Sequence, residues 1–294
     1  MTARPRTEKP ALRRRERSTR PRTTRRLPLH FLHANGFPSS SYRAMFAALE
    51  PGFVIDSIEM LGHDPAYPVT DGWPHLVAQL VDKLAARRSP PVIGVGHSLG
   101  AYVTFMAATL RPELFRAVIM IDAPIIYGWK GTAFGMIKRL GLADRVTPAG
   151  ATRDRRAEWP SRAEARAHLG SRGVFRSFDP RCLDDYVRHG TRRARIGVRL
   201  AYAPAIEYEI YRTTPHDLEA YLPRFAVPGG MLLGRDSDVV RRVGLAASKR
   251  RFVLRWVPGG HLFPFEHPEV AAAAITDLAH ELTSVAPSGS AATR

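Results

Sequence analysis

Short apolar runs alternate with longer segments of helical periodicity along most of the chain. The apolar runs are bounded by turn residues and occupy 27–32, 53–56, 92–95, 117–121, 231–233 and 252–257. Apolar residues recur at helical spacing over 42–49, 73–87, 99–110, 237–247 and 268–282. Because strands that alternate with helices form βαβ units, this pattern predicts an α/β fold. We expect a mostly parallel sheet of about six strands with helices on both faces.

The alternation stops for about a hundred residues between Asp122 and Pro223, where helical signals are interrupted by Pro and Gly. This change predicts a core made of 27–124 and 223–283, with an inserted helical cap at 125–222. Aromatic and Met side chains are frequent in the insertion. We expect most of them to form the cap's own core and a minority to line a pocket.

The positive charge of the chain, +17 in all, is concentrated in two segments. Residues 1–26 hold 11 Lys or Arg and 2 Glu, and residues 125–222 hold 18 basic and 11 acidic residues. The first segment is rich in Arg, Pro and Thr and nearly free of apolar residues, which predicts a disordered basic tail. We interpret the tail as a solvated extension or as the result of a misassigned start codon. The alternatives are an organelle transit peptide or an arm that binds nucleic acid or an anionic membrane.

Composition limits the remaining possibilities. A chain of 294 residues with 45% hydrophobic content is long enough to bury a large core. No run approaches the roughly 20 apolar residues of a membrane span, and the tail lacks the apolar segment of a secretory signal. The single cysteine, Cys182, excludes a disulfide within the chain and indicates a reducing compartment, so we expect a cytoplasmic protein. Residues 284–294 read as a frayed end.

The most informative motif is Gly96-His97-Ser98-Leu99-Gly100, a G-x-S-x-G that follows a predicted buried strand and precedes a predicted helix. The five letters alone are weak evidence, but the strand-turn-helix context is that of a nucleophile elbow. At such an elbow the serine occupies a strained tight turn, and the glycines are small because strand and helix pass close together. Ser98 is therefore a candidate nucleophile.

A serine needs a base to take its proton and a third group to orient that base. His261 stands on the loop that leaves the last predicted strand, and Asp236 and Asp238 stand on the exit loop of the strand before it. The resulting order is Ser, Asp, His, with each residue just past a strand end. Asp238 is our choice for the acid, while Asp236 and Asp122, which closes the strand at 117–121, remain alternatives.

Over about residues 28–283 the chain resembles the α/β-hydrolase superfamily, in particular bacterial serine hydrolases with a helical cap, of the esterase-like branch. The stretches that carry the resemblance are 33–38, the elbow at 96–100, 236–239 and 259–264. The resemblance implies Ser98 as nucleophile, Asp238 as acid, His261 as base, and the backbone N–H groups of Leu99 and Asn35 as an oxyanion hole.

Two stretches depart from the family pattern. Relatives usually carry His followed directly by Gly, whereas this chain has His33-Ala34-Asn35-Gly36. Gly36 or Phe37 is therefore an alternative second oxyanion donor. The loop at 59–64 lacks the Arg and second Gly that relatives commonly carry there. His33 and His97 are interpreted as packing groups or as groups that contact the catalytic residues, and not as catalysts. The other histidines lack the paired spacing of a metal site.

These features together predict a hydrolase that cleaves a carboxylic ester or related acyl bond through an acyl-enzyme, without metal or organic cofactor. The expected partner is a small-molecule ester or acyl substrate with an apolar part. Two alternatives stay open. One is a non-hydrolytic member of the same fold, such as a lyase, an acyltransferase or a cofactor-free oxygenase. The other is a binding protein that acts through the basic tail.

Overall fold

The computed structural model describes residues 26–87, 90–153 and 155–284. The predictions for the basic tail and for the frayed end lie outside these residues, apart from Arg26 and Ser284. Ser284 is the last residue of a long helix, so this helix runs two residues beyond its predicted end at Leu282.

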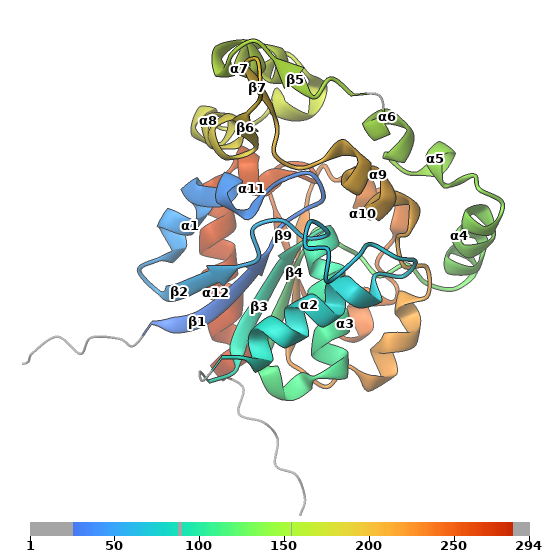
Figure 1. The fold of residues 1–294 in the computed structure, drawn as a ribbon. Helices are drawn as coiled ribbons and strands as arrows, with labels where there is room; N and C mark the ends of the chain where they lie inside the picture. Colours follow the sequence, from blue (N-terminus) through green and yellow to red (C-terminus); the bar gives the residue numbers. More distant parts are fainter. Residues whose placement is uncertain (1–25, 88–89, 154, 285–294) are drawn as a thin grey trace, which may run out of the picture.

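A six-stranded sheet forms the centre of the molecule (Figure 1). Its strands are β1 (Leu27–Leu32), β2 (Phe53–Ser57), β3 (Val92–His97), β4 (Phe115–Ile121), β8 (Gly229–Gly234) and β9 (Val253–Val257). They lie in the order β2-β1-β3-β4-β8-β9, and every neighbouring pair is parallel. The predicted α/β class and all six predicted strands are confirmed. Because the strands are parallel, the loops that leave β3, β4, β8 and β9 meet at one edge of the sheet.

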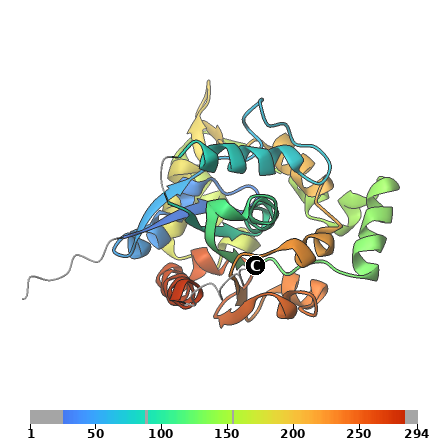
Figure 2. The same cartoon turned by 90° about the horizontal axis from the view of Figure 1, so that it is seen from below.

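Helices cover both faces of this sheet (Figure 2). On one face lie α1 (Arg43–Leu49) and α12 (Pro268–Ser284), and on the other lie α2 (Pro74–Ala85) and α3 (Leu99–Leu110). Successive side chains of β4 alternate between the two cores, since Ile119 packs with the α1 and α12 side while Met120 packs with the α2 and α3 side. This alternation is the period of two that a strand buried on both faces must have.

Shorter elements complete the core of the fold. They are η1 (Ser39–Tyr42), η2 (Pro112–Leu114), α10 (Asp238–Val243), η5 (Ser248–Arg250) and α11 (Phe263–Glu266). The helix predicted over 237–247 is shorter in the structure, because it ends at Gly244, whose φ of 82° is left-handed. Glycine adopts this conformation without steric cost and commonly ends helices.

The segment between β4 and β8 lies along the edge of the sheet at which the strands end (Figure 1). Its helical elements are α4 (Trp129–Arg139), α5 (Ala143–Val146), α6 (Ala149–Arg153), α7 (Arg162–Gly170), η3 (Gly173–Phe175), α8 (Pro180–His189), α9 (Pro204–Arg212) and η4 (Leu218–Arg224). It also holds a small antiparallel sheet made of β5 (Glu158–Trp159), β6 (Thr191–Arg193) and β7 (Val198–Leu200). The cap predicted as helical thus contains three short strands that were not predicted from the sequence. Strands of two or three residues are too short to produce a visible alternation.

Candidate active site

Ser98 forms the turn between β3 and α3. Its backbone has φ 53° and ψ −111°, a conformation that is unfavourable for a residue with a Cβ. The glycines on either side of Ser98 explain how the turn is accommodated. A Cβ on Gly96 would lie 2.3 Å from the Gly100 carbonyl oxygen, and a Cβ on Gly100 would lie 2.3 Å from that of Leu32. The predicted elbow geometry is thus present, with strand and helix in direct backbone contact.

The close contact between Gly96 and the backbone of α3 predicts a loss of stability when a side chain is added at Gly96. Gly96→Ala should lower the free energy of unfolding by about 3 kcal/mol, because the new methyl group meets backbone atoms that belong to a helix. Denaturant unfolding measures the change. Gly52→Ala is the matched control, since its nearest neighbour is the Leu49 carbonyl oxygen at 3.9 Å, and it should shift stability by no more than about 0.5 kcal/mol. Equal stability of the two variants would contradict the close contact at the elbow.

A chain of two hydrogen bonds joins three side chains at the carboxyl edge of the sheet. His261, on the loop after β9, has its Nε2 atom 3.1 Å from Ser98 Oγ. Its Nδ1 atom lies 2.7 Å from Oδ2 of Asp122, the residue that follows β4. The Asp122 side chain is fully buried, while that of His261 is 28% exposed. Such an arrangement allows a proton to move from the serine oxygen to an imidazole that a carboxylate orients.

Asp122 is held in place by two further donors. The backbone N–H of Gly234 donates to its Oδ1 at 2.8 Å, and the Ser237 hydroxyl donates to its Oδ2 at 2.5 Å. Its backbone has a φ of 48°, a left-handed conformation that Asp tolerates better than most residues. Three donors therefore fix the orientation of the carboxylate that faces His261.

The prediction that Asp238 contacts the histidine is wrong. Asp238 is the first residue of α10, its side chain is 74% exposed, and its carboxylate pairs with Arg241. An acidic residue in the first helical turn is favoured there by the helix dipole. Asp236 is also exposed. Both line the mouth of the adjoining pocket, but neither reaches the imidazole that Asp122 contacts.

The residues predicted for an oxyanion hole lie beside Ser98. Leu99 begins α3, so its N–H is one of the first-turn donors without a partner inside the helix. Asn35 is buried at the pocket wall, and its Nδ2 donates to the Glu207 carbonyl oxygen at 2.9 Å. Of the alternatives, the N–H of Phe37 is already used, because it donates to the Ala34 carbonyl oxygen at 3.1 Å. This bond counts against Phe37 as the second oxyanion donor.

Two charged residues of the insertion, of which Glu207 contacts the same loop, were not predicted from the sequence. Glu207 of α9 is buried, and its carboxylate fills the space where a Cβ on Gly36 would lie, 2.8 Å from Cδ. Arg155 forms an ion pair with Glu207, in which Nη1 donates to Oε1 at 3.3 Å and Nη2 lies 2.5 Å from Oε2. Burial raises the pKa of Glu207 to about 7, while the Arg155 guanidinium acts in the opposite direction. The insertion therefore supports the loop that holds Asn35.

Known proteins share the fold of this chain. Residues 31–274 match the sequence model of the Alpha/beta hydrolase family. The chain belongs to that family. Among solved structures, the chain is similar to E-2-(acetamidomethylene)succinate hydrolase, with a TM-score of 0.66 and 23% identity, covering 86% of this chain and 91% of the other. A thioesterase domain from the curacin biosynthetic pathway has a TM-score of 0.67 at 16% identity, covering 86% and 92%.

Curated relatives match this chain over shorter stretches. A type I acyl-CoA thioesterase, mpaH of Penicillium brevicompactum, is 34% identical over 99 residues, which are 34% of this chain and 21% of the thioesterase. An epoxide hydrolase of Caballeronia sordidicola is 28% identical over 120 residues, covering 38% of this chain and 36% of that enzyme. The chain thus spans well under half of either relative.

A cavity of about 570 Å³ lies next to Ser98 and His261. Most of its lining is apolar or aromatic, and the side chains come from both the core and the insertion: Trp73, Leu99, Tyr102, Ile126, Phe134, Val146, Ile210, Tyr211 and Val239. Most other aromatic residues of the insertion are buried away from this cavity, among them Trp159, Phe175 and Phe178. Trp129 is an exception, because it is 76% exposed.

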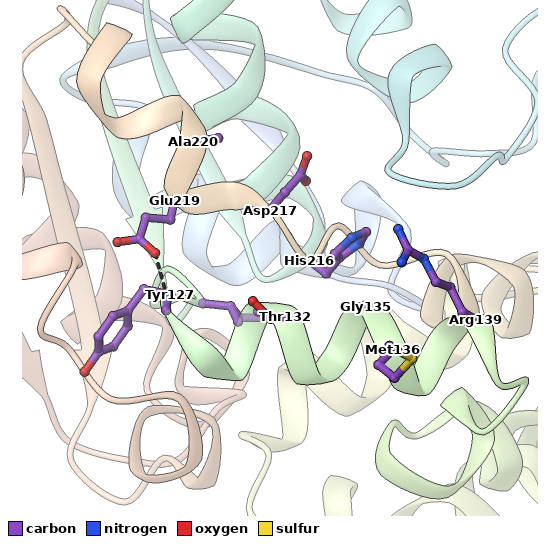
Figure 3. A pocket seen from close by; sticks show the side chains of 12 residues that line it. Tyr127, Thr132, Gly135, Met136, Arg139, His216, Asp217, Glu219 and Ala220 are labelled. Carbon is purple, nitrogen blue, oxygen red and sulfur yellow. Dashed lines mark hydrogen bonds between the residues drawn. The ribbon is translucent and has the colours of Figure 1, made fainter.

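A second cavity of about 420 Å³ lies between α4 and the segment around His216 (Figure 3). Gly131 and Gly135 let α4 approach this segment, since a Cβ on Gly135 would lie 2.5 Å from the His216 ring. Glu219 closes one end by accepting a hydrogen bond from the Gly128 N–H at 2.6 Å. Neither Ser98 nor His261 lines this cavity, although Ile126 lines both this cavity and the one next to Ser98.

Within the described ranges, no group of three His, Cys, Asp or Glu side chains is arranged to hold a metal ion. A search of the same ranges finds no helix with the length and apolar character needed to cross a membrane.

Proposed function

We propose that this protein is a serine hydrolase that cleaves a carboxylic ester or related acyl bond. The observation that carries the proposal is the hydrogen-bond chain from Ser98 through His261 to Asp122. Ser98 Oγ attacks the substrate carbonyl carbon as His261 Nε2 takes the hydroxyl proton, and Asp122 stabilises the imidazolium that forms. His261 then returns the proton to the leaving group.

The acyl-enzyme that results is hydrolysed by the same residues in reverse roles. His261 removes a proton from a water molecule, the water oxygen attacks the ester carbonyl, and Ser98 leaves with the proton that His261 returns. In both steps negative charge develops on the carbonyl oxygen. The N–H of Leu99 and a main-chain donor at Asn35 or Gly36 stabilise that charge. Such stabilisation is usually the largest single contribution to the rate enhancement in acyl transfer.

The acyl group of the substrate has an apolar part. The lining of the 570 Å³ cavity supports this proposal, since aromatic and aliphatic side chains surround the space next to Ser98. The similarity to an acyl-CoA thioesterase supports including thioesters among the candidate bonds.

A panel of p-nitrophenyl esters of increasing acyl length tests the proposal. We expect turnover of short and medium chains, because the cavity is bounded by the insertion, with kcat/KM falling by about tenfold or more for the longest chains. Rates of p-nitrophenol release measure this dependence. Turnover of long-chain or highly charged esters alone would contradict the pocket argument.

The same panel, repeated with added alcohols or thiols, separates hydrolysis from acyl transfer. We expect free acid as the main product in both conditions, measured by mass spectrometry. A new ester or thioester as the main product would identify an acyltransferase.

A further inference from the structure

Tyr42 and His97 lie beneath the candidate active site and have no role in the reaction as described so far. Both are almost completely buried, with 1% and 0% of their surfaces exposed. Tyr42 ends η1, and His97 ends β3 directly before Ser98. Their polar atoms are nevertheless all paired, and these pairs connect separate parts of the site.

The hydrogen bonds of His97 determine where its proton lies. Nε2 of His97 is 2.9 Å from the carbonyl oxygen of His261, which can only accept, so Nε2 carries the hydrogen. Nδ1 is 2.8 Å from the Tyr42 hydroxyl. The Ala34 N–H donates to that hydroxyl at 3.1 Å, so the hydroxyl hydrogen points to Nδ1. Burial lowers the pKa of His97, in agreement with the neutral ring that these bonds require.

The chain of bonds therefore runs from Ala34 through Tyr42 and His97 to the main chain of His261. Ala34 immediately precedes Asn35 on the loop proposed to hold the oxyanion. His261 is held at two points by adjacent residues, because His97, the last residue of β3, binds its carbonyl group and Ser98, in the following turn, binds its ring. These two contacts together constrain the distance between Ser98 Oγ and His261 Nε2.

We propose that Tyr42 and His97 are positioning residues, which hold the base His261 and the oxyanion loop in register with Ser98. The proposal rests on the proposed hydrolase function. Neither residue touches the reacting atoms. Their contribution is to the rate of the chemical step, since misplacement of reacting groups by about 1 Å can cost a hundredfold, and not to substrate binding in the cavity.

Tyr42→Phe removes one hydroxyl and leaves the ring packing unchanged. We expect kcat to fall by about tenfold to a hundredfold, with KM changed by less than about threefold. Ser39→Ala is the matched control, because Ser39 lies in the same short helix and loses a comparable buried bond, to the Ile58 carbonyl oxygen at 2.7 Å. This control should keep wild-type kcat.

Two variants of His97 provide a second measurement. His97→Gln retains an N–H that can reach the His261 carbonyl, whereas His97→Met does not. We expect His97→Met to lower kcat at least as much as Tyr42→Phe does. The kcat of His97→Gln should be at least about threefold higher than that of His97→Met. Rates are normalised to the folded fraction, determined by thermal unfolding of each variant.

Labelling with a serine-directed fluorophosphonate tests the proposed hydrolase function and the positioning role separately. If the wild type is not labelled at Ser98, the proposed function fails. If the wild type is labelled and Tyr42→Phe reacts at the same rate per folded molecule, the positioning role fails. It also fails if kcat falls equally in Ser39→Ala, or if His97→Gln and His97→Met are equally impaired, because general destabilisation would then explain the loss.

Discussion

Ser98→Ala should lower kcat by at least about a thousandfold, and His261→Ala should do the same, because the members of a catalytic triad act as a unit. Without the hydroxyl there is no atom to form the acyl-enzyme. Without the imidazole, 3.1 Å from Ser98 Oγ, nothing removes the hydroxyl proton. Steady-state hydrolysis of the best p-nitrophenyl ester measures both effects, with circular dichroism to verify the fold.

His280→Ala is a suitable control for the histidine, since His280 is exposed on α12 and should retain wild-type kcat. A fluorophosphonate probe should label the wild type and leave Ser98→Ala unlabelled. Full activity in Ser98→Ala would refute the serine hydrolase proposal, because the nucleophile would then lie elsewhere.

The sheet could be predicted from the sequence because its strands carry two independent signals. Each strand is a short apolar run, and each is separated from the next by turn residues and a segment of helical periodicity. The elbow was predictable for a related reason. Gly96 and Gly100 flank Ser98 between a predicted strand and a predicted helix, a context that indicates close contact between the two, and the structure shows that contact.

The acid partner could not be chosen from the sequence, because three aspartates follow strands that end at the same edge. The choice depends on the conformation of single residues. Asp122 turns inward with a φ of 48° and meets donors from Gly234 and Ser237, whereas the hydroxyl of Ser237 caps α10 and leaves Asp238 facing solvent. Sequence spacing does not specify such details.

Contacts between the insertion and the core could not be predicted from the sequence either. Asn35 and Glu207 are separated by 172 positions, yet the Asn35 side chain donates to the Glu207 carbonyl oxygen. Glu207 was missed because a lone Glu in a helical segment normally indicates a solvated face. The one available signal was Gly36, since a glycine beside the oxyanion loop indicates a close neighbour.

Asp122→Asn should lower kcat by about a hundredfold to ten-thousandfold, with little change in KM. The physical reason is the tautomer of His261. An amide NH2 group in place of Oδ2 would donate to His261 Nδ1, 2.7 Å away, and so place the ring hydrogen on Nε2. Nε2 then cannot accept the proton of Ser98. We expect the variant to stay folded, because the amide oxygen still accepts the Gly234 N–H.

Asp238→Asn and Asp236→Asn complete the experiment as matched controls, since each makes the same chemical change at a carboxylate that lines the cavity mouth. Both should change kcat by less than about threefold, because their side chains are exposed and do not contact the imidazole. Measured kcat values for the three Asn variants therefore identify the acid directly. Near-normal activity of Asp122→Asn together with an inactive Asp238→Asn would show that α10 rearranges in solution and brings Asp238 to His261, and it would move the acid away from β4.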